Sequence, residues 1–286
     1  MTATETNQSQ VYQVPTRRIP VTRILCPNPG MMTGPGTNSY LIGSKRRVLL
    51  DPGPDIAAHR QRILSLLGDD VLDSVLVTHT HGDHSPGALA FQQATGARLI
   101  GCQPSPESQH QDETFVADLE PIDKQMLDID GVRIQAIHTP GHVGNHVCWY
   151  LPEEELLFTG DHILEGTTPV ILPPDGDMAA YLSALRRIQG MQCERLAPGH
   201  GQIIEQPDRV IQHVIDHRLA REEKIFNALQ VSGEALTVEA LVRNVYQDVS
   251  PSLWPWAAKT LLAHLIKLAA EQRISHDQKN DEWKAV

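Results

Sequence analysis

The sequence lacks the features that mark secreted, membrane-spanning or disulfide-stabilised proteins. It has only four cysteines, at positions 26, 102, 148 and 193, and no two of them form a CxxC pair. No apolar run approaches the ~18 residues that cross a membrane. The opening MTATETNQSQ carries neither the positive charge nor the apolar stretch of a secretory signal. We therefore expect reduced thiols, a cytoplasmic location and no membrane association.

Positive charge is also scarce. Lys and Arg together number 24 against 35 Asp and Glu, which gives a formal net charge of -11. This balance argues against a broad, nonspecific grip on nucleic acid or on an anionic membrane. The hydrophobic share of 41 % and the length of 286 residues suit a globular chain with a large buried core.

Short β-rich runs alternate with helical patterns through most of the chain. RVLLDPG (47–53) and SVLVTH (74–79) are typical of strands, and residues 56–67 have the apolar spacing of a helix. Ser85 is expected to cap a helix that Gly96 ends. The alternation predicts an α/β (α+β) layered domain over 19–206, preceded by a loose N-terminal segment over 1–18.

The C-terminal part has a different pattern. Residues 207–233 predict one linking helix. Two helical patterns and a short hairpin, RISHDQKNDEWKAV, then follow. Helices followed by a small β-hairpin predict a winged-helix-like domain over 234–286.

The stretch HTHGDH (79–84) concentrates metal-binding side chains just after a predicted strand. His79 and His81 are two residues apart in extended chain, so both rings project to the same side and can share one ion. Gly82 lets the chain turn, so that Asp83 and His84 can face a neighbouring site. One short segment therefore supplies ligands for two ions, and each ion needs more ligands from elsewhere.

Three later residues, each at the end of a predicted strand, complete the set. They are His142 in HTPGHVGNH, Asp161 in FTGDHI and His200 in APGHG. We expect one ion to be held by His79, His81 and His142, the other by Asp83, His84 and His200, and Asp161 to bridge them.

Imidazole and carboxylate ligands without thiolate fit two Zn²⁺ best, although Fe or Mn can occupy such a site. Ions roughly 3.5–4 Å apart share a water and lower its pKa, which makes a bridging hydroxide available near neutral pH. The competing interpretation is an accidental histidine cluster on a surface loop. It suits an isolated HxH pair, but not HxHxDH followed by three further ligands at strand ends.

Other candidates are weighed against simpler roles. Asp51 ends a predicted strand and is either an acceptor for a ligand imidazole or a turn cap before Pro52. His146 and His162 lie near expected ligands and are expected to touch substrate, to support a ligand or to play neither role. His138 is expected to face the core or to support the ligand loop. Six other histidines are expected on polar helix faces, in loops or in the small domain: His59, His110, His213, His217, His264 and His276.

With these ligands in place, the chain resembles a metallo-β-lactamase-fold hydrolase. HTHGDH, HTPGH, FTGD and PGHG occur in that family's order over residues 20 to about 205. The resemblance implies an αβ/βα four-layer sandwich with a dinuclear site at one edge.

GDHILEGTTPVI, HRLAREEKI and NDEWKAV, together with the terminal winged helix, narrow the resemblance to the β-lactamase-like protein 2 subgroup. This implies a zinc-dependent hydrolase, and the animal members are associated with endoribonuclease action on single-stranded RNA. His162 stands where those members carry cysteine, which affects the substrate pocket rather than the metals.

The expected substrate is anionic, because two Zn²⁺ ions outweigh the charges of Asp83, Asp161 and a bridging hydroxide. The first substrate hypothesis is a phosphodiester such as single-stranded RNA. The second is a thioester or ester, as for enzymes of the glyoxalase II or lactonase kind. Asp83 is the candidate for proton transfer.

A third hypothesis, of another class, is a regulator that binds nucleic acid through the winged helix. Residues 234–286 hold six basic and seven acidic residues, so no duplex DNA binding is expected. The sequence leaves the oligomeric state open.

Overall fold

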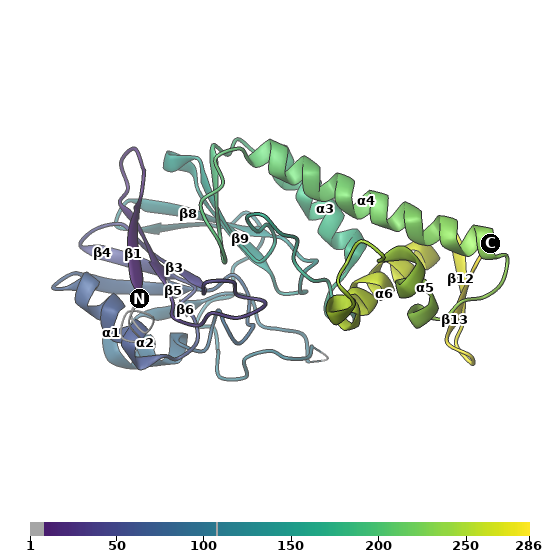
Figure 1. Ribbon diagram of the computed structural model, residues 1–286. Helices are drawn as coiled ribbons and strands as arrows, with labels where there is room; N and C mark the ends of the chain where they lie inside the picture. The colour runs from purple at the N-terminus through teal and green to yellow at the C-terminus, as the bar shows by residue number, and fades with distance from the viewer. Residues whose placement is uncertain (1–8, 107) are drawn as a thin grey trace. The chain divides into compact units, whose positions relative to one another are not determined.

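The computed structural model describes residues 9–106 and 108–286 (Figure 1). By their contacts these residues divide into two compact units. The first unit comprises the described residues up to 139 together with 145–169 and 190–207, and the second comprises 140–144, 170–189 and 208–286. No helix in the described part of the chain is both long and apolar enough to cross a membrane.

The first unit contains a six-stranded sheet. Its strands run in chain order as β1 (Gln10–Val14), β2 (Val21–Leu25), β3 (Asn38–Ile42), β4 (Arg46–Leu50), β5 (Val71–Leu76) and β6 (Arg98–Ile100). The first four strands pair antiparallel, while β4, β5 and β6 pair parallel. Parallel neighbours need crossover connections, and α1 (Ala57–Leu67) and α2 (Ala88–Thr95) supply them.

A second sheet of the same unit has five strands in the order β11-β10-β9-β8-β7. They are β7 (Met126–Ile129), β8 (Val132–His138), β9 (Val147–Leu151), β10 (Leu156–Gly160) and β11 (Arg195–Pro198). A short 3₁₀ turn, η1 (Pro152–Glu154), joins β9 to β10. The β7–β8 turn has Asp130 and Gly131 at positive φ, which is the geometry of the two-residue hairpin predicted there.

Two hydrophobic clusters stabilise this unit. One joins the two sheets and includes Tyr40, Ile134, Trp149 and Phe158. The other lies between the first sheet and the helices α1 and α2, and includes Phe91. The strands β4 and β5 are buried on both faces where they approach their carboxyl ends, which explains the continuous apolar residues there.

The expectation of a loose segment over 1–18 is wrong for residues 10–14. These residues form β1, which pairs antiparallel with β2 over its whole length. Farther along, the backbone N–H groups of Arg17, Arg18 and Ile19 all donate to the buried carboxylate of Glu154. A distant carboxylate thus fixes a polar segment that shows no apolar pattern of its own. Residues 1–8 lie outside the described part of the chain.

Glycine ends α2 as predicted, but serine does not begin it. Gly96 is the C-cap in the left-handed conformation, whereas the helix starts at Ala88 with no side-chain cap. The Ser85 hydroxyl instead donates to Asp112, 2.7 Å away.

The second unit consists of α3 (Met178–Gln189), α4 (Pro207–Ser232), α5 (Val238–Val245), the 3₁₀ turn η2 (Pro251–Leu253), α6 (Trp254–Ala270), and the hairpin β12 (Ile274–Asp277) and β13 (Glu282–Ala285). Ile225 and Leu229 of α4 belong to the same buried cluster as α5, α6 and Trp283 of the hairpin. The long helix is therefore part of the winged-helix core and is not only a linker.

We predict that Glu154→Gln destabilises the first unit by about 1.5–3 kcal/mol, the worth of hydrogen bonds to a buried charge. The glutamine side-chain amide would point its own N–H donors at backbone N–H groups that need an acceptor. Urea unfolding of this variant and of Glu153→Gln, whose ion pair with exposed Arg133 contributes less, measures the difference. Equal unfolding midpoints for the two variants would contradict this anchoring role.

Candidate metal centre

The HTHGDH segment begins shortly after β5 ends, and both sheets hold the two residues just before it. The Trp149 indole donates to Val77 O at 3.0 Å, and the Val147 N–H donates to Thr78 O at 2.8 Å, both from β9. The Thr78 N–H donates to Asp51 Oδ1 at 2.7 Å, from the end of β4. Strands of both sheets therefore fix the backbone from which His79 and its neighbours project.

Asp161 and His200 follow the parallel neighbours β10 and β11, so their side chains emerge at the same sheet edge. The Gly199 N–H donates to Gly160 O at 2.8 Å. From β3, the Asn38 amide donates to the carbonyls of Pro198 and Gly201 at 3.0 and 2.9 Å. These bonds hold the His200 loop from both sides.

Two imidazole nitrogens and two carboxylates converge at this edge of the sheets. His200 Nε2 lies 3.2 Å from Asp83 Oδ2 and 3.3 Å from Asp161 Oδ1. His84 Nε2 lies 3.4 Å from Asp161 Oδ1 and 3.6 Å from Asp83 Oδ2. Asp83, His84 and His200 can hold one cation, and so can His79, His84 and Asp161, because the ligand atoms of each group lie within 4.8 Å of one another.

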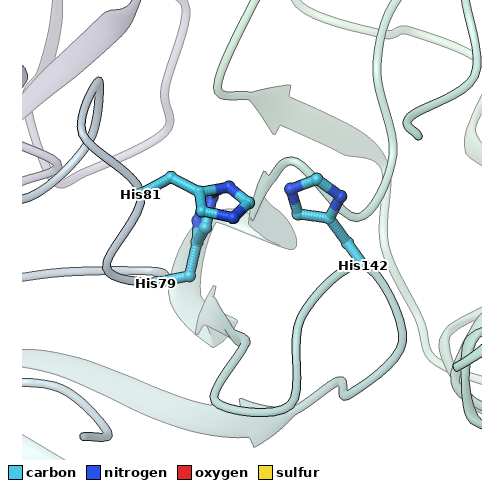
Figure 2. Close-up of side chains that lie close together, drawn as sticks. All are labelled: His79, His81 and His142. Atoms are coloured by element: carbon cyan, nitrogen blue, oxygen red, sulfur yellow. Dashed lines mark hydrogen bonds between the residues drawn. The ribbon is translucent and has the colours of Figure 1, made fainter. Parts of the chain in front are cut away.

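His79, His81 and His142 form a third such group, and Figure 2 shows their rings close together. His142 stands on the segment 140–144, which belongs by its contacts to the second unit. The other six expected ligands all belong to the first unit.

The chemistry of these atoms fits a metal ion. His84 Nε2 and His200 Nε2 are buried and form no hydrogen bond. Their other ring nitrogens face oxygen acceptors, since His84 Nδ1 lies 2.9 Å from Asp51 Oδ2 and His200 Nδ1 lies 3.1 Å from Gly36 O. An imidazole that donates from Nδ1 presents the lone pair of Nε2, which is the usual arrangement of a metal ligand.

Two glycines make room for this packing. A Cβ on Gly160, which has a φ of 46°, would lie 2.5 Å from Thr78 Oγ1. A Cβ on Gly199 would lie 2.7 Å from His84 Cε1 and 2.8 Å from Asp161 Oδ1. A side chain at Gly199 would displace two expected ligands, and one at Gly160 would displace Thr78, which bonds the Asp51 carboxylate.

Charge pairing dominates the electrostatics of the metal-free site. Burial lowers the pKa of His84, but Asp83 and Asp161 outweigh burial and hold it well above its ordinary value. Against the same effect of burial, Asp161 raises the pKa of His200 to about 10. Burial raises the pKa of Asp161, yet His200 and His84 bring it well below the usual range. Without a metal, protons on the histidines supply the positive charge that the carboxylates require.

The additional candidates also lie at this edge. Asp51 Oδ2 lies 2.9 Å from His84 Nδ1, and its role as the acceptor for a ligand imidazole stays a prediction. His146 is buried, and its Nδ1 shares a hydrogen bond of 2.8 Å with the Thr139 hydroxyl. Its ring centre lies 5.1 Å from that of His79. His162 is fully buried, with its ring 5.7 Å from that of His146.

His59 has a more specific environment than the polar helix face, loop or small domain expected for it. It is 1 % exposed and lies between the hydroxyls of Ser9 and Ser39. Its polar neighbours Arg60, Gln61 and Arg62 in the chain concealed this burial. Asn38 was missed, and only its place in the strand beside the site could have indicated its role.

Two packed sheets with helices, and a buried cluster of histidines and carboxylates at their shared edge, define a metallohydrolase-type site. Residues 32–200 match the model of the metallo-beta-lactamase superfamily, and residues 237–283 match the beta-lactamase associated winged helix domain. The chain belongs to the metallo-beta-lactamase superfamily and is a hydrolase of that superfamily with a C-terminal winged helix. The fold class expected from the sequence is confirmed.

Two relatives illustrate the range of proteins to which the chain is similar. The beta-lactamase-like protein 2 homolog of Drosophila melanogaster is 34 % identical over 278 residues, covering 92 % of this chain and 92 % of that protein. The atrochrysone carboxyl ACP thioesterase of Aspergillus fumigatus is 36 % identical over 277 residues, covering 89 % and 82 %. The resemblance to the β-lactamase-like protein 2 subgroup is confirmed.

A solved structure has the same architecture. A metallo-beta-lactamase family protein of Thermus thermophilus superposes with a TM-score of 0.75 at 21 % identity, covering 97 % of this chain and 98 % of that one. This likeness concerns the fold.

We predict that Asp51→Asn lowers metal affinity by about 10–100-fold, the usual effect of losing the partner of a ligand imidazole. An amide N–H facing Nδ1 would favour the tautomer that carries its proton on Nε2, where the metal binds. Competition titration against a chromophoric chelator measures the affinity. Asp55→Asn, which changes an exposed ion pair with Arg60, is the control, and matching affinities for the two variants would contradict the prediction.

We also predict that metal binding at pH 7 releases protons, because His84 and His200 have raised pKa values in the metal-free protein. Affinity should fall as the pH is lowered. In the metal-free protein, the His200 pairing adds stability that is fully present below the ordinary pKa of 6.5 and is lost as the pH rises through about 10. Calorimetric titration in buffers of different ionisation enthalpy counts the protons, and a count of zero would be inconsistent with this charge balance.

Proposed function

We propose that this chain is a dinuclear metallohydrolase that cleaves acyl thioesters. His79, His81 and His142 would hold one ion, Asp83, His84 and His200 would hold the other, and Asp161 would be a ligand shared by both. The observation that carries the proposal is the convergence of His84 Nε2 and His200 Nε2, buried and without hydrogen bonds, on the carboxylates of Asp83 and Asp161.

The ligand set suits Zn²⁺, with Fe or Mn as alternatives, because it contains imidazole and carboxylate and no thiolate. When bound, such a pair of ions supplies a nucleophile from water at neutral pH and stabilises the negative charge that develops on the substrate carbonyl oxygen. The protein orients the rings of His84 and His200 through acceptors at Nδ1, the ring nitrogen that would not bind the metal. These acceptors are the Asp51 carboxylate and the main-chain oxygen of Gly36.

Asp83 is the residue best placed to move a proton. Its side chain is 28 % exposed, whereas that of Asp161 is 13 % exposed and that of His84 is fully buried. Asp83 can therefore take up a proton from solvent and pass it to the leaving thiolate, in addition to its role as a candidate metal ligand.

The acidic character of the chain favours a thioester over RNA. The net charge of -11 opposes association with a polyanion. In the winged helix, Lys267 pairs with Glu222 and Glu271, and Arg273 lies near Glu222 and Glu223. These pairs neutralise two of the six basic residues that a nucleic-acid surface would need.

Trp254 of the winged helix supports the same conclusion. The Trp254 indole donates to Val249 O at 3.2 Å, and its ring packs against the domain core. Its packing limits the exposed face on which a nucleic-acid base could stack. The thioesterase of Aspergillus fumigatus, which is similar over most of the chain, adds support for a thioester. Cleavage of single-stranded RNA stays a prediction from the sequence.

The test compares an acyl thioester and a 5′-labelled single-stranded RNA as substrates for the zinc-loaded protein. We expect thioester hydrolysis that falls at least ~100-fold in Asp83→Asn and in His84→Ala, because each removes a ligand from the reacting centre. His213→Ala, at an exposed position of α4, should retain full activity. Metal removal by a chelator and restoration by Zn²⁺ complete the series.

RNA cleavage without thioester hydrolysis, lost in the same two variants, would replace the thioester by a phosphodiester. If the zinc-loaded protein cleaves neither substrate, the proposed reaction is wrong. Activity that is equal in all variants would come from a contaminant and would likewise contradict the assignment.

A further inference from the structure

A chain of four buried side chains leads from the first described residue to the metal centre. Ser9 Oγ lies 2.8 Å from His59 Nδ1, and Ser39 Oγ lies 2.9 Å from His59 Nε2. Ser39 Oγ also bonds the main-chain oxygen of Asp51, whose carboxylate lies 2.9 Å from His84 Nδ1. Exposure is 7 % at Ser9, 0 % at Ser39, 1 % at His59 and 2 % at Asp51.

The direction of these hydrogen bonds follows from the Asp51 end. A carbonyl oxygen only accepts, so the Ser39 hydroxyl proton goes to Asp51 O. His59 Nε2 must then donate to Ser39 Oγ, and His59 Nδ1 accepts from the Ser9 hydroxyl. Burial lowers the pKa of His59 to about 4, in agreement with a neutral ring that carries a single proton.

Asp51 needs such support because its backbone is in an unfavourable conformation. Its φ is 48°, in the left-handed region, and the next residue is Pro52. Left-handed geometry is uncommon for residues other than glycine and persists where surrounding contacts determine it. The Asp51 N–H donates to Leu76 O at 2.9 Å, and its carbonyl oxygen accepts from Ser39.

The Asp51 carboxylate depends on this backbone. Asp51 Oδ1 accepts a hydrogen bond from the Thr78 N–H at 2.7 Å. Asp51 Oδ2 accepts one from the Thr78 hydroxyl at 2.8 Å and faces His84 Nδ1. A rotation of the Asp51 main chain would move both oxygens, and with them the ring of His84.

We propose that His59 is a positioning residue of the metal centre. Through the Ser39 hydroxyl, His59 fixes the main chain of Asp51 and so sets the orientation of His84. This role rests on the proposed function, in which the site holds two metal ions. It extends that proposal to a residue that is not itself a metal ligand. The donor at His59 Nε2 carries the effect, whereas the bulk of the ring serves only packing.

Two amide substitutions separate these contributions. In His59→Gln, the amide nitrogen can occupy the place of Nε2 and donate to Ser39. In His59→Asn, the shorter side chain reaches only the place of Nδ1, so the bond to Ser39 is lost. His213→Asn, at an exposed position of α4, is the control.

The experiment titrates each metal-free variant with Co²⁺ and records the visible absorption bands, the dissociation constants and the thermal midpoint. We expect His59→Asn to bind one of two Co²⁺ equivalents about 10-fold more weakly, with altered absorption bands. We expect His59→Gln to resemble the wild type in both. Ser39→Ala, a smaller change, should reproduce the loss seen in His59→Asn.

Three outcomes would overturn the positioning role. The first is wild-type affinity and spectrum in His59→Asn or Ser39→Ala. The second is an equal loss of Co²⁺ affinity in His59→Asn and His59→Gln, in proportion to the drop in their thermal midpoints. That pattern would indicate that the ring acts through packing alone. The third is a wild type that takes up no Co²⁺ or Zn²⁺, which would contradict the metal centre itself; uptake of two ions without thioester hydrolysis would contradict only the substrate proposal.

Discussion

The buried carboxylate of Asp51 is the interaction on which the rest of the site depends. It sits at the end of β4 and joins that strand to the HTHGDH segment through Thr78 and His84. A carboxylate that is 2 % exposed is costly to bury unless its oxygens are fully bonded. Because these bonds use both oxygens, the backbone of the ligand segment has little freedom to vary.

The two sheets contribute to the site in complementary ways. The first sheet supplies the HTHGDH segment after β5 and holds the His200 loop through Asn38. The second sheet supplies Asp161 and His200 and holds the HTHGDH segment through Trp149. Each sheet therefore fixes proposed ligands that the other presents, so hydrophobic packing between the sheets also sets distances within the candidate metal centre.

Much of this arrangement was predictable from local sequence patterns. HTHGDH, FTGD and PGHG each follow a strand, and ligands at the ends of parallel neighbours meet at one edge. The hairpin at Asp130 and Gly131 was predictable because that turn requires positive φ at both positions. Gly96 likewise ends α2 by its left-handed conformation.

The features that the sequence did not predict share a physical cause, since each depends on partners far away in the chain. Residues 10–14 form β1 because β2 offers an unpaired edge, and Glu154 holds Arg17 and Arg18 across more than 130 residues. Ser85 bonds Asp112 rather than capping α2. His59 is surrounded by polar residues in the chain, and only the fold brings Ser9 and Ser39 to its ring. Local propensity contains no information about such contacts.

The central claim is that the buried histidines and carboxylates form one dinuclear metal centre. X-ray absorption spectroscopy at the metal edge, on protein loaded with Zn²⁺ to saturation and with the bound metal quantified, tests this claim most directly. The account predicts two ions per chain, nitrogen and oxygen ligands only, and a metal–metal scattering distance of roughly 3.5–4 Å. Sulfur in the first coordination sphere, or a single ion without a metal–metal contribution, would contradict it.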